Sequence, residues 1–245
     1  MTTLTAADRS TVPAYLALPV TTSRSPGPWP GVVLVHDAFG LGDDAKEQAD
    51  WLAAAGYAVI APDLFSRGGM LRCLRSTFRQ LSDRRGRAFD EIETARAHLA
   101  ARDDCTGRTG VIGYCMGGGF ALLLAGGGGY DAASVNYGQV PDDVDDVLDG
   151  ACPVVGSFGG ADRSLPGAAE KLSGALARAG VAQDVHEYPG VGHGFINRLA
   201  VLSPVNPLLS AAGVGYDHTA AADAKQRILR FFDTHLTGPA DPTGD

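Results

Sequence analysis

A cysteine set among glycines is the residue of this chain best suited to covalent chemistry. The segment VIGYCMGGGF contains Gly113, Cys115 and Gly117 in the pattern G-x-C-x-G, and two further glycines follow. A thiolate is a good nucleophile, and a helix that begins beneath the sulfur favours the ionised form. Glycine inside a helix costs roughly 1 kcal/mol relative to alanine. Three consecutive glycines therefore indicate that another requirement offsets this cost.

The pattern lies between a predicted strand and a predicted helix, as in a nucleophile elbow with cysteine in place of serine. Such a sharp turn strains the central residue and points its side chain over the edge of the sheet. Side chains near it would then collide, so we interpret Gly113, Gly117 and Gly118 as room for close approach, and Gly119 as incidental. A buried structural cysteine in a glycine-rich contact is the alternative for the motif alone.

A cysteine nucleophile needs a base, and the base needs an acid that orients it. Asp162 in GSFGGADRSLP and His193 in YPGVGHGFINR each follow a predicted strand, where sites of open α/β sheets gather. Each residue alone is more typical of a turn or a solvated loop. Together with Cys115 they stand in the chain order nucleophile, acid, base, which predicts a triad. The histidines that compete less well lie in predicted helices or strands or near a helix: His98, His186, His218 and His235.

Acyl transfer by such a triad also requires donors for an oxyanion. The main-chain N–H of Met116, which follows the cysteine, is one expected donor. The other is expected from the loop DAFGLG, where we choose Ala38.

The elements that must position these residues alternate along the chain. Buried strands are predicted at 31–36, 57–64, 109–114, 133–138, 152–160 and 183–190, and helices at 43–56, 89–101, from Cys115 to 125, 166–180 and 219–236. The alternation predicts an α/β fold with a mostly parallel central sheet and helices on both faces. The segment AYLALP is expected to add an antiparallel edge. We expect one domain over 1–245, with a disordered tail at 237–245.

Composition excludes several classes of function. The net charge of −8 and the pI near 5.1 argue against nucleic-acid or anionic-membrane partners. No apolar run reaches the roughly 20 residues of a membrane helix, and the first 20 residues lack the pattern of a secretory signal. We therefore expect a cytoplasmic protein. The four scattered cysteines suggest neither a disulfide framework nor a zinc site.

Several segments together resemble one known family. TVPAYLALP, GVVLVHDAFGL, APDLF, GYCMGGG, FGGAD and GHGF are similar in order and spacing to dienelactone hydrolases, the carboxymethylenebutenolidase branch of the α/β-hydrolases, from about residue 11 to 236. The resemblance implies an α/β-hydrolase fold in which Cys115 is the nucleophile, Asp162 the acid and His193 the base. It implies the opening of a small lactone or ester through a thioester, with no cofactor or metal. We expect a monomer or a small homo-oligomer.

The chain departs from the family pattern at two places. The family commonly has a glutamate near the thiol where this chain has Asp37, which is shorter by one methylene. Two interpretations of Asp37 stay open: an acid close to the thiol, and a residue that caps a turn. Family members that act on dienelactone also hold the substrate carboxylate with arginines. Arg198 is a candidate, although the family position could align with Asn197 instead. The second arginine falls among Arg67, Arg72, Arg75 and Arg79, of which we retain Arg72 and Arg75.

Other interpretations stay open. A general carboxylesterase or thioesterase would use the same triad on another substrate, and a non-catalytic redox sensor would oxidise the thiol instead. The long segment 198–218 has the length of a lid. The acidic segment 141–150 lacks the pattern of a calcium loop and favours a solvated helix start.

Overall fold

The structure is a computed structural model that describes residues 1–6, 8–21, 27–68, 70–198 and 214–237, with the side chains of 70 and 71 left aside. The strands are β1 (Thr2–Thr5), β2 (Thr11–Ala17), β3 (Trp29–Val35), β4 (Ala58–Pro62), β5 (Cys105–Tyr114), β6 (Ala132–Asn136), β7 (Val154–Gly159) and β8 (Gln183–Tyr188). The helices are α1 (Asp43–Ala54), α2 (Met70–Asp83), α3 (Arg87–Ala100), α4 (Met116–Ala125), α5 (Val144–Val147), α6 (Ala168–Arg178) and α9 (His218–Phe232), and a π-helix, Asp233–Thr237, follows α9.

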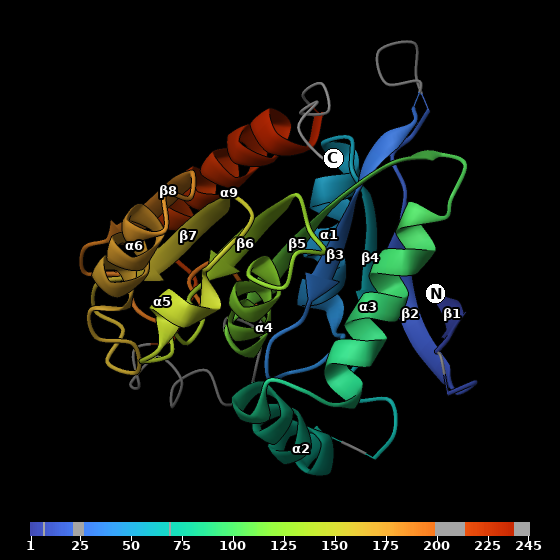
Figure 1. The fold of residues 1–245 in the computed structure, drawn as a ribbon, viewed down its shortest axis with the longest axis horizontal. Helices are drawn as coiled ribbons and strands as arrows, with labels where there is room; N and C mark the ends of the chain where they lie inside the picture. The colour runs from blue at the N-terminus through green and yellow to red at the C-terminus, as the bar shows by residue number, and fades with distance from the viewer. Residues whose placement is uncertain (7, 22–26, 69, 199–213, 238–245) are drawn as a thin grey trace.

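The strands form one eight-stranded sheet in the order β1-β2-β4-β3-β5-β6-β7-β8 (Figure 1). The strands from β3 to β8 run parallel, whereas β1 and β2 are antiparallel additions beside β4. This confirms the predicted α/β class. The expected antiparallel strand exists as β2, but it is not the edge strand, because the unpredicted β1 pairs outside it. Four residues with three threonines carry too little hydrophobic pattern to be recognised.

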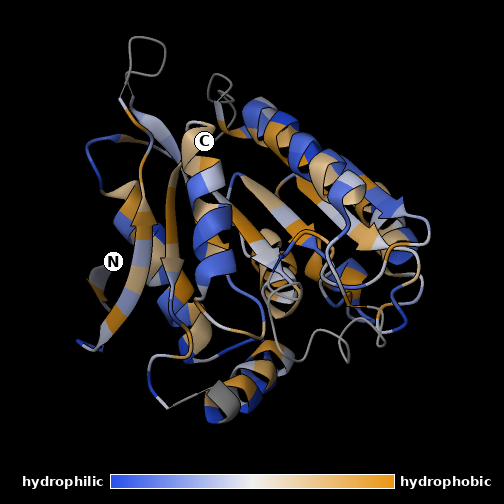
Figure 2. Cartoon of the chain, turned by 180° about the vertical axis from the view of Figure 1, so that it is seen from behind, coloured by the Kyte–Doolittle hydropathy of each residue, from blue (hydrophilic) through white to orange (hydrophobic). Residues whose placement is uncertain are grey.

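Each face of the sheet carries its own hydrophobic core. Alternate residues of β3 divide between them: Val32 and Leu34 belong to the core that includes α1 and α9, whereas Val33 and Val35 belong to the core that includes α3, α4 and α6. Figure 2 shows the strands as largely apolar and the helices as polar on their outer sides. Both faces are therefore covered, as a parallel sheet requires. No helix among the described residues is long and apolar enough to cross a bilayer.

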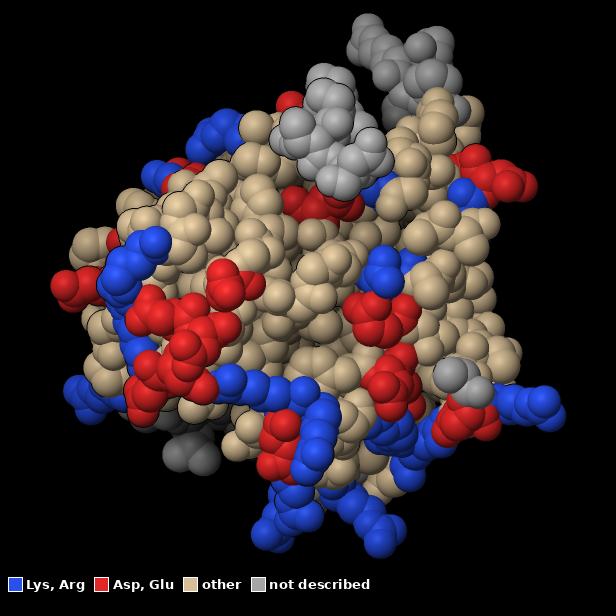
Figure 3. Space-filling model, viewed as in Figure 1, with Lys and Arg blue, Asp and Glu red and all other residues tan. Residues whose placement is uncertain are grey.

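Helix α2 was not predicted from the sequence. Its buried face consists of Cys73, Thr77 and Leu81, at the spacing of one helical stripe, and two of these three are only weakly hydrophobic or polar. The rest of α2 is rich in exposed arginine, and Figure 3 shows Lys and Arg side chains gathered at the end of the molecule where α2 lies. Between these arginines, Cys73, Leu74, Phe78 and Leu81 recur at helical spacing, so the sequence does contain the pattern of this helix.

The chain reverses its direction of winding at β3. It first places β4 on one side of β3 and then crosses to place β5 on the other side. The loops that follow β3 and β5 therefore lead away from each other, which opens a crevice at the carboxyl ends of these strands. The loop with Asp37 and Ala38 and the turn with Cys115 both lie at this crevice.

The turn from β5 into α4 is possible only with glycine at three positions. A Cβ atom on Gly113 would overlap the carbonyl of Gly117, and one on Gly117 would overlap the carbonyl of Val35. At Gly118 it would lie 2.7 Å from the Asn136 carbonyl oxygen. At Gly119 it would meet only the movable side chain of Leu81, at 2.9 Å. The interpretation of the glycines as room for close approach is confirmed.

The difference between these glycines gives a matched pair of variants. We expect Gly117→Ala to lower the free energy of unfolding by at least about 3 kcal/mol, because main chain cannot move aside as a side chain can. Gly119→Ala gains up to about 1 kcal/mol of helix propensity and should stay within about 1 kcal/mol of the wild type. Urea denaturation followed by circular dichroism measures both. Equal losses in the two variants would contradict the steric argument.

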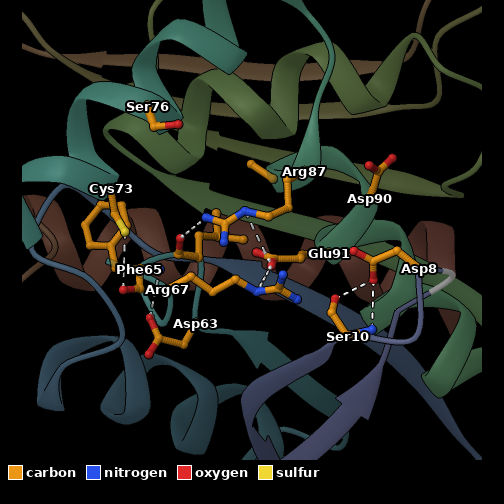
Figure 4. Close-up of polar contacts among 12 residues, drawn as sticks. Asp8, Ser10, Asp63, Phe65, Arg67, Cys73, Ser76, Arg87, Asp90 and Glu91 are labelled. Atoms are coloured by element: carbon orange, nitrogen blue, oxygen red, sulfur yellow. Dashed lines mark hydrogen bonds and ion pairs between the residues drawn. The ribbon is translucent and has the colours of Figure 1, made fainter. Parts of the chain in front are cut away.

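A buried carboxylate joins α3 to the segment after β4. The Glu91 side chain is 1% exposed and lies between two arginines, with its Oε1 3.8 Å from Nε of Arg67 and 3.7 Å from Nε of Arg87 (Figure 4). Neither carboxylate oxygen has a hydrogen-bond partner among the described residues. Burial raises the pKa of Glu91, and the two arginines only partly oppose this. The folded protein therefore holds the Glu91 proton more tightly than the unfolded chain does.

This shift predicts how Glu91→Gln changes stability with pH. The stabilisation from a raised pKa is complete below the unfolded value of 4.5 and is lost as the pH rises through the folded value. The free energy of unfolding of the wild type minus that of Glu91→Gln should therefore fall as the pH rises from 4.5. Urea titrations between pH 4.5 and 7.5 measure this difference. Glu93→Gln, an equal charge change on the same helix, is the control and should show no such fall.

Candidate active site

Cys115 occupies the strained turn between β5 and α4. Its backbone has φ 54° and ψ −114°, in the left-handed half of the map that few non-glycine residues adopt. Its N–H donates to the Asn136 carbonyl at 3.0 Å, which ties the turn to the end of β6. The side chain is partly exposed at the first turn of α4. The sulfur thus lies at the N-terminus of α4, the positive end of the helix dipole.

Asp162 and His193 meet at the same edge of the sheet, from the loops after β7 and β8. The Asp162 Oδ2 lies 2.5 Å from the His193 Nδ1. The other oxygen, Oδ1, accepts hydrogen bonds from the N–H of Ser164 at 2.9 Å and from its hydroxyl at 2.6 Å. Because an ionised carboxylate can only accept, Nδ1 carries the proton and Nε2 is left for the thiol.

The electrostatics of this group favour a charged imidazole. Burial lowers the pKa of His193, but the hydrogen bonds and charges of Cys115 and Asp162 outweigh it and raise the pKa to about 9. Burial would raise the pKa of Asp162, yet the hydrogen bonds from Ser164 and His193 bring it below its ordinary value. Asp162 is thus hydrogen-bonded to His193, and His193 lines the same pocket as Cys115.

The loop after β3 is held by a buried histidine that sequence reasoning did not single out. His36 is 1% exposed, and its Nδ1 donates to the Asp37 carbonyl at 2.8 Å. Its Nε2 accepts from the N–H of Leu64 at 3.2 Å, so the ring is neutral with the proton on Nδ1. Burial accordingly lowers the pKa of His36. His36 therefore connects the loop after β3 to the end of β4.

Asp37 lies in the pocket beside Cys115, but its oxygens are held by other groups. Its Oδ1 accepts from the Phe39 N–H at 2.8 Å, the contact of a turn cap, and its Oδ2 accepts from the Asn197 side-chain amide at 2.8 Å. Burial raises the pKa of Asp37, and these two hydrogen bonds partly oppose the shift. Asp37 therefore lines the same pocket as the thiol, while its carboxyl group also stabilises the loop after β3.

The pocket over Cys115 is small, with a volume of about 40 Å³. It is lined by Asp37, Ala38, Phe39, Cys115, Tyr137, His193, Gly194, Asn197 and Val214. Ala38 thus lies where the second oxyanion donor is expected. Met116 is the first residue of α4, where a main-chain N–H has no acceptor within the helix.

Tyr137 is a pocket residue that the sequence analysis missed. It follows β6, and its ring packs edge-on against that of His193 at a centroid distance of 5.1 Å. Burial raises the pKa of its hydroxyl well above the ordinary value. The sequence signal that could have identified Tyr137 is its position at the end of the buried strand β6, at the sheet edge where the other site residues lie.

The three arginines considered for substrate binding lie elsewhere in the described structure. Arg198 is exposed, with its guanidinium 5.2 Å from the ring centroid of Tyr216, and the preceding Asn197 faces the pocket instead. Arg72 and Arg75 on α2 line a separate surface groove. Most of the expected lid, 199–213, and the expected tail after Thr237 lie outside the described residues. Among the described residues, no group of His, Cys, Asp and Glu side chains could hold a metal ion.

Comparison with known proteins supports one family. The model of the dienelactone hydrolase family matches residues 12–236. The carboxymethylenebutenolidase of Rhodococcus opacus is 30% identical over 84% of this chain and 81% of its own. That of Pseudomonas putida is 28% identical over 85% of this chain and 87% of its own.

A solved structure agrees with the fold. The dienelactone hydrolase of Anabaena variabilis superposes with a TM-score of 0.65 at 18% identity, covering 96% of each chain. Together with the family match, this shows that the chain belongs to the dienelactone hydrolase family of the α/β-hydrolases and is a hydrolase of the carboxymethylenebutenolidase type.

Proposed function

We propose that this enzyme cleaves small lactones or esters through a Cys115–His193–Asp162 triad and a thioester intermediate. The observation that carries the proposal is the arrangement of Asp162, which is hydrogen-bonded to His193, and of Cys115, which lies on the strained turn and lines the same pocket as His193. It has the order and roles of a nucleophile, a base and an orienting acid.

In the proposed acylation the proton of the Cys115 thiol is held on Nε2 of His193, which leaves a thiolate. The sulfur attacks the carbonyl carbon, and a C–S bond forms while the carbonyl oxygen becomes an oxyanion. Main-chain N–H groups of Met116 and Ala38 stabilise that charge. The intermediate then expels the alkoxide, which takes the proton from His193, and a thioester remains on the sulfur.

Deacylation reverses the roles of the same groups. His193 takes a proton from water, the hydroxide attacks the thioester carbonyl, and the C–S bond breaks. The thiolate leaves and recovers the proton from His193, and the acid is released. Asp162 stabilises the charged imidazole in both half-reactions.

A general carboxylesterase is the second candidate, and one observation favours it. The described pocket has apolar walls at Phe39 and Val214 and contains none of the three candidate arginines. An ester without a carboxylate would fit this pocket at least as well as a dienelactone.

The acyl-enzyme is directly testable. We expect intact-protein mass spectrometry during turnover of 4-nitrophenyl acetate to show one acetyl group, mapped by peptide digestion to Cys115. Cys115→Ala should lose the adduct and at least about a thousandfold in kcat/KM, because the nucleophile is removed. Cys105→Ala is the matched control and should keep both. Full esterase activity in Cys115→Ala would refute the proposed triad, and a thiol that never acylates across an ester panel would favour the redox sensor.

The role of Asp162 predicts a change in the titration of His193. In the wild type the imidazole should titrate near pH 9. In Asp162→Asn the midpoint should fall, because the imidazolium loses an adjacent negative charge and an acceptor that favours its charged form. The shift of the carbon-bound imidazole protons in NMR measures both midpoints, with His193→Asn to assign the signal. We expect kcat/KM to fall by about 10²–10⁴ in the same variant. An unchanged midpoint would contradict the assignment of the acid.

A further inference from the structure

The pocket wall beside the nucleophile contains a carboxyl group that the proposed triad does not use. The acids of the site are Asp162, which holds His193, and Asp37, which lies in the pocket wall itself. Neither Lys nor Arg is among the residues that line the pocket in the described part of the chain. A substrate group near Asp37 therefore meets a carboxylate, while the positive charge of the His193 imidazole in the same pocket is paired with Asp162.

A series of amide contacts shows that the Asp37 side chain is held as an acceptor. Gln48 donates from Nε2 to the Ile196 carbonyl at 3.3 Å, and a carbonyl can only accept. The same nitrogen lies 3.5 Å from the Oδ1 of Asn197. This orients the Asn197 amide so that its Nδ2 donates to Asp37 Oδ2 at 2.8 Å. With the Phe39 N–H on Oδ1, both Asp37 oxygens accept hydrogen bonds, which is the arrangement of a carboxylate.

The nearest cationic side chain along the chain is directed elsewhere. Arg198 follows Asn197, but its guanidinium lies over the Tyr216 ring and its main-chain N–H donates to Asp44 at 3.1 Å. The segment 199–213, with the sequence LAVLSPVNPLLSAAG, contains no Lys, Arg or His. It therefore supplies no cation to the pocket, whatever its path.

The described arginines that precede the nucleophile are not among the residues that line the pocket. Those of α2 line a separate groove, formed by Arg72, Arg75, Ser76 and Arg79.

We propose that Asp37 makes this site selective for esters and lactones whose acyl group is uncharged, and that it discriminates against acyl groups that end in a carboxylate. This inference rests on the proposed function, because it concerns the substrate of the same thiol. Like charges repel strongly in a pocket partly shielded from water. The apolar side chains of Phe39 and Val214 on the same wall suit an uncharged acyl chain. Asp37 is thus a specificity-determining residue in this proposal.

Two substrates of nearly equal shape isolate the charge. The phenyl monoester of glutaric acid ends in a carboxylate, and the phenyl ester of glutaramic acid ends in an uncharged amide. We expect the wild type to turn over the amide ester with a kcat/KM at least about tenfold higher, because only the carboxylate is repelled. The rate without enzyme is subtracted for each ester.

Variants then assign the preference to one residue. Asp37→Asn removes the charge and keeps an oxygen for the Phe39 N–H, and should lower the ratio of the two kcat/KM values by about fivefold or more. A merely structural role would slow both esters alike and leave the ratio unchanged. Asp43→Asn is the control, since it makes the same charge change on a side chain that is 95% exposed at the start of α1. Asp37→Ser replaces the asparagine variant if that variant does not fold.

The outcomes separate this inference from the proposed function. Equal turnover of the two esters by the wild type, or a ratio that stays the same in Asp37→Asn, would overturn the role of Asp37 while leaving the triad intact. An equal change of the ratio in Asp43→Asn would also overturn it. If neither ester acylates Cys115, the proposed function fails, and the selectivity fails with it.

Discussion

The close contact of main chain with main chain where β5 turns into α4 is the constraint on which the site depends. Without side chains on Gly113 and Gly117, the start of α4 can lie directly against the end of β3. This contact places Cys115 in the left-handed region and leaves its side chain as the one that projects from the turn. The strain is local, but the sheet and α4 together keep it in place.

The same contact connects the nucleophile to its surroundings. Because Gly117 lies against the carbonyls of Val35 and His36, the loop that follows β3 begins directly beside the thiol. His36 then fixes this loop from beneath through its two ring nitrogens. The expected donors of the oxyanion hole, Met116 and Ala38, therefore belong to the start of α4 and to the loop after β3. The close main-chain contact at Gly117 fixes the distance between these two segments. Preorganised donors of this kind need no rearrangement when charge develops.

Sequence patterns predicted the parts of the site that local chain geometry determines. The glycines around Cys115 and the positions of Asp162 and His193 after strands are local signals, and these three residues do meet. Tyr137, His36 and the contact of Asn197 with Asp37 depend on which strands become neighbours, which no single segment encodes. Helix α2 differs, because its apolar residues recur at helical spacing in the sequence and the segment was interpreted only through its arginines.

Asp37 shows how one methylene changes what a residue can do. An aspartate side chain is short enough to accept a hydrogen bond from the N–H two residues later, and Asp37 does so with Phe39. The contact from Asn197 then occupies the remaining oxygen, so the carboxylate stays in the wall of the pocket. The shorter side chain thus couples the shape of the loop after β3 to the charge that an incoming acyl group meets.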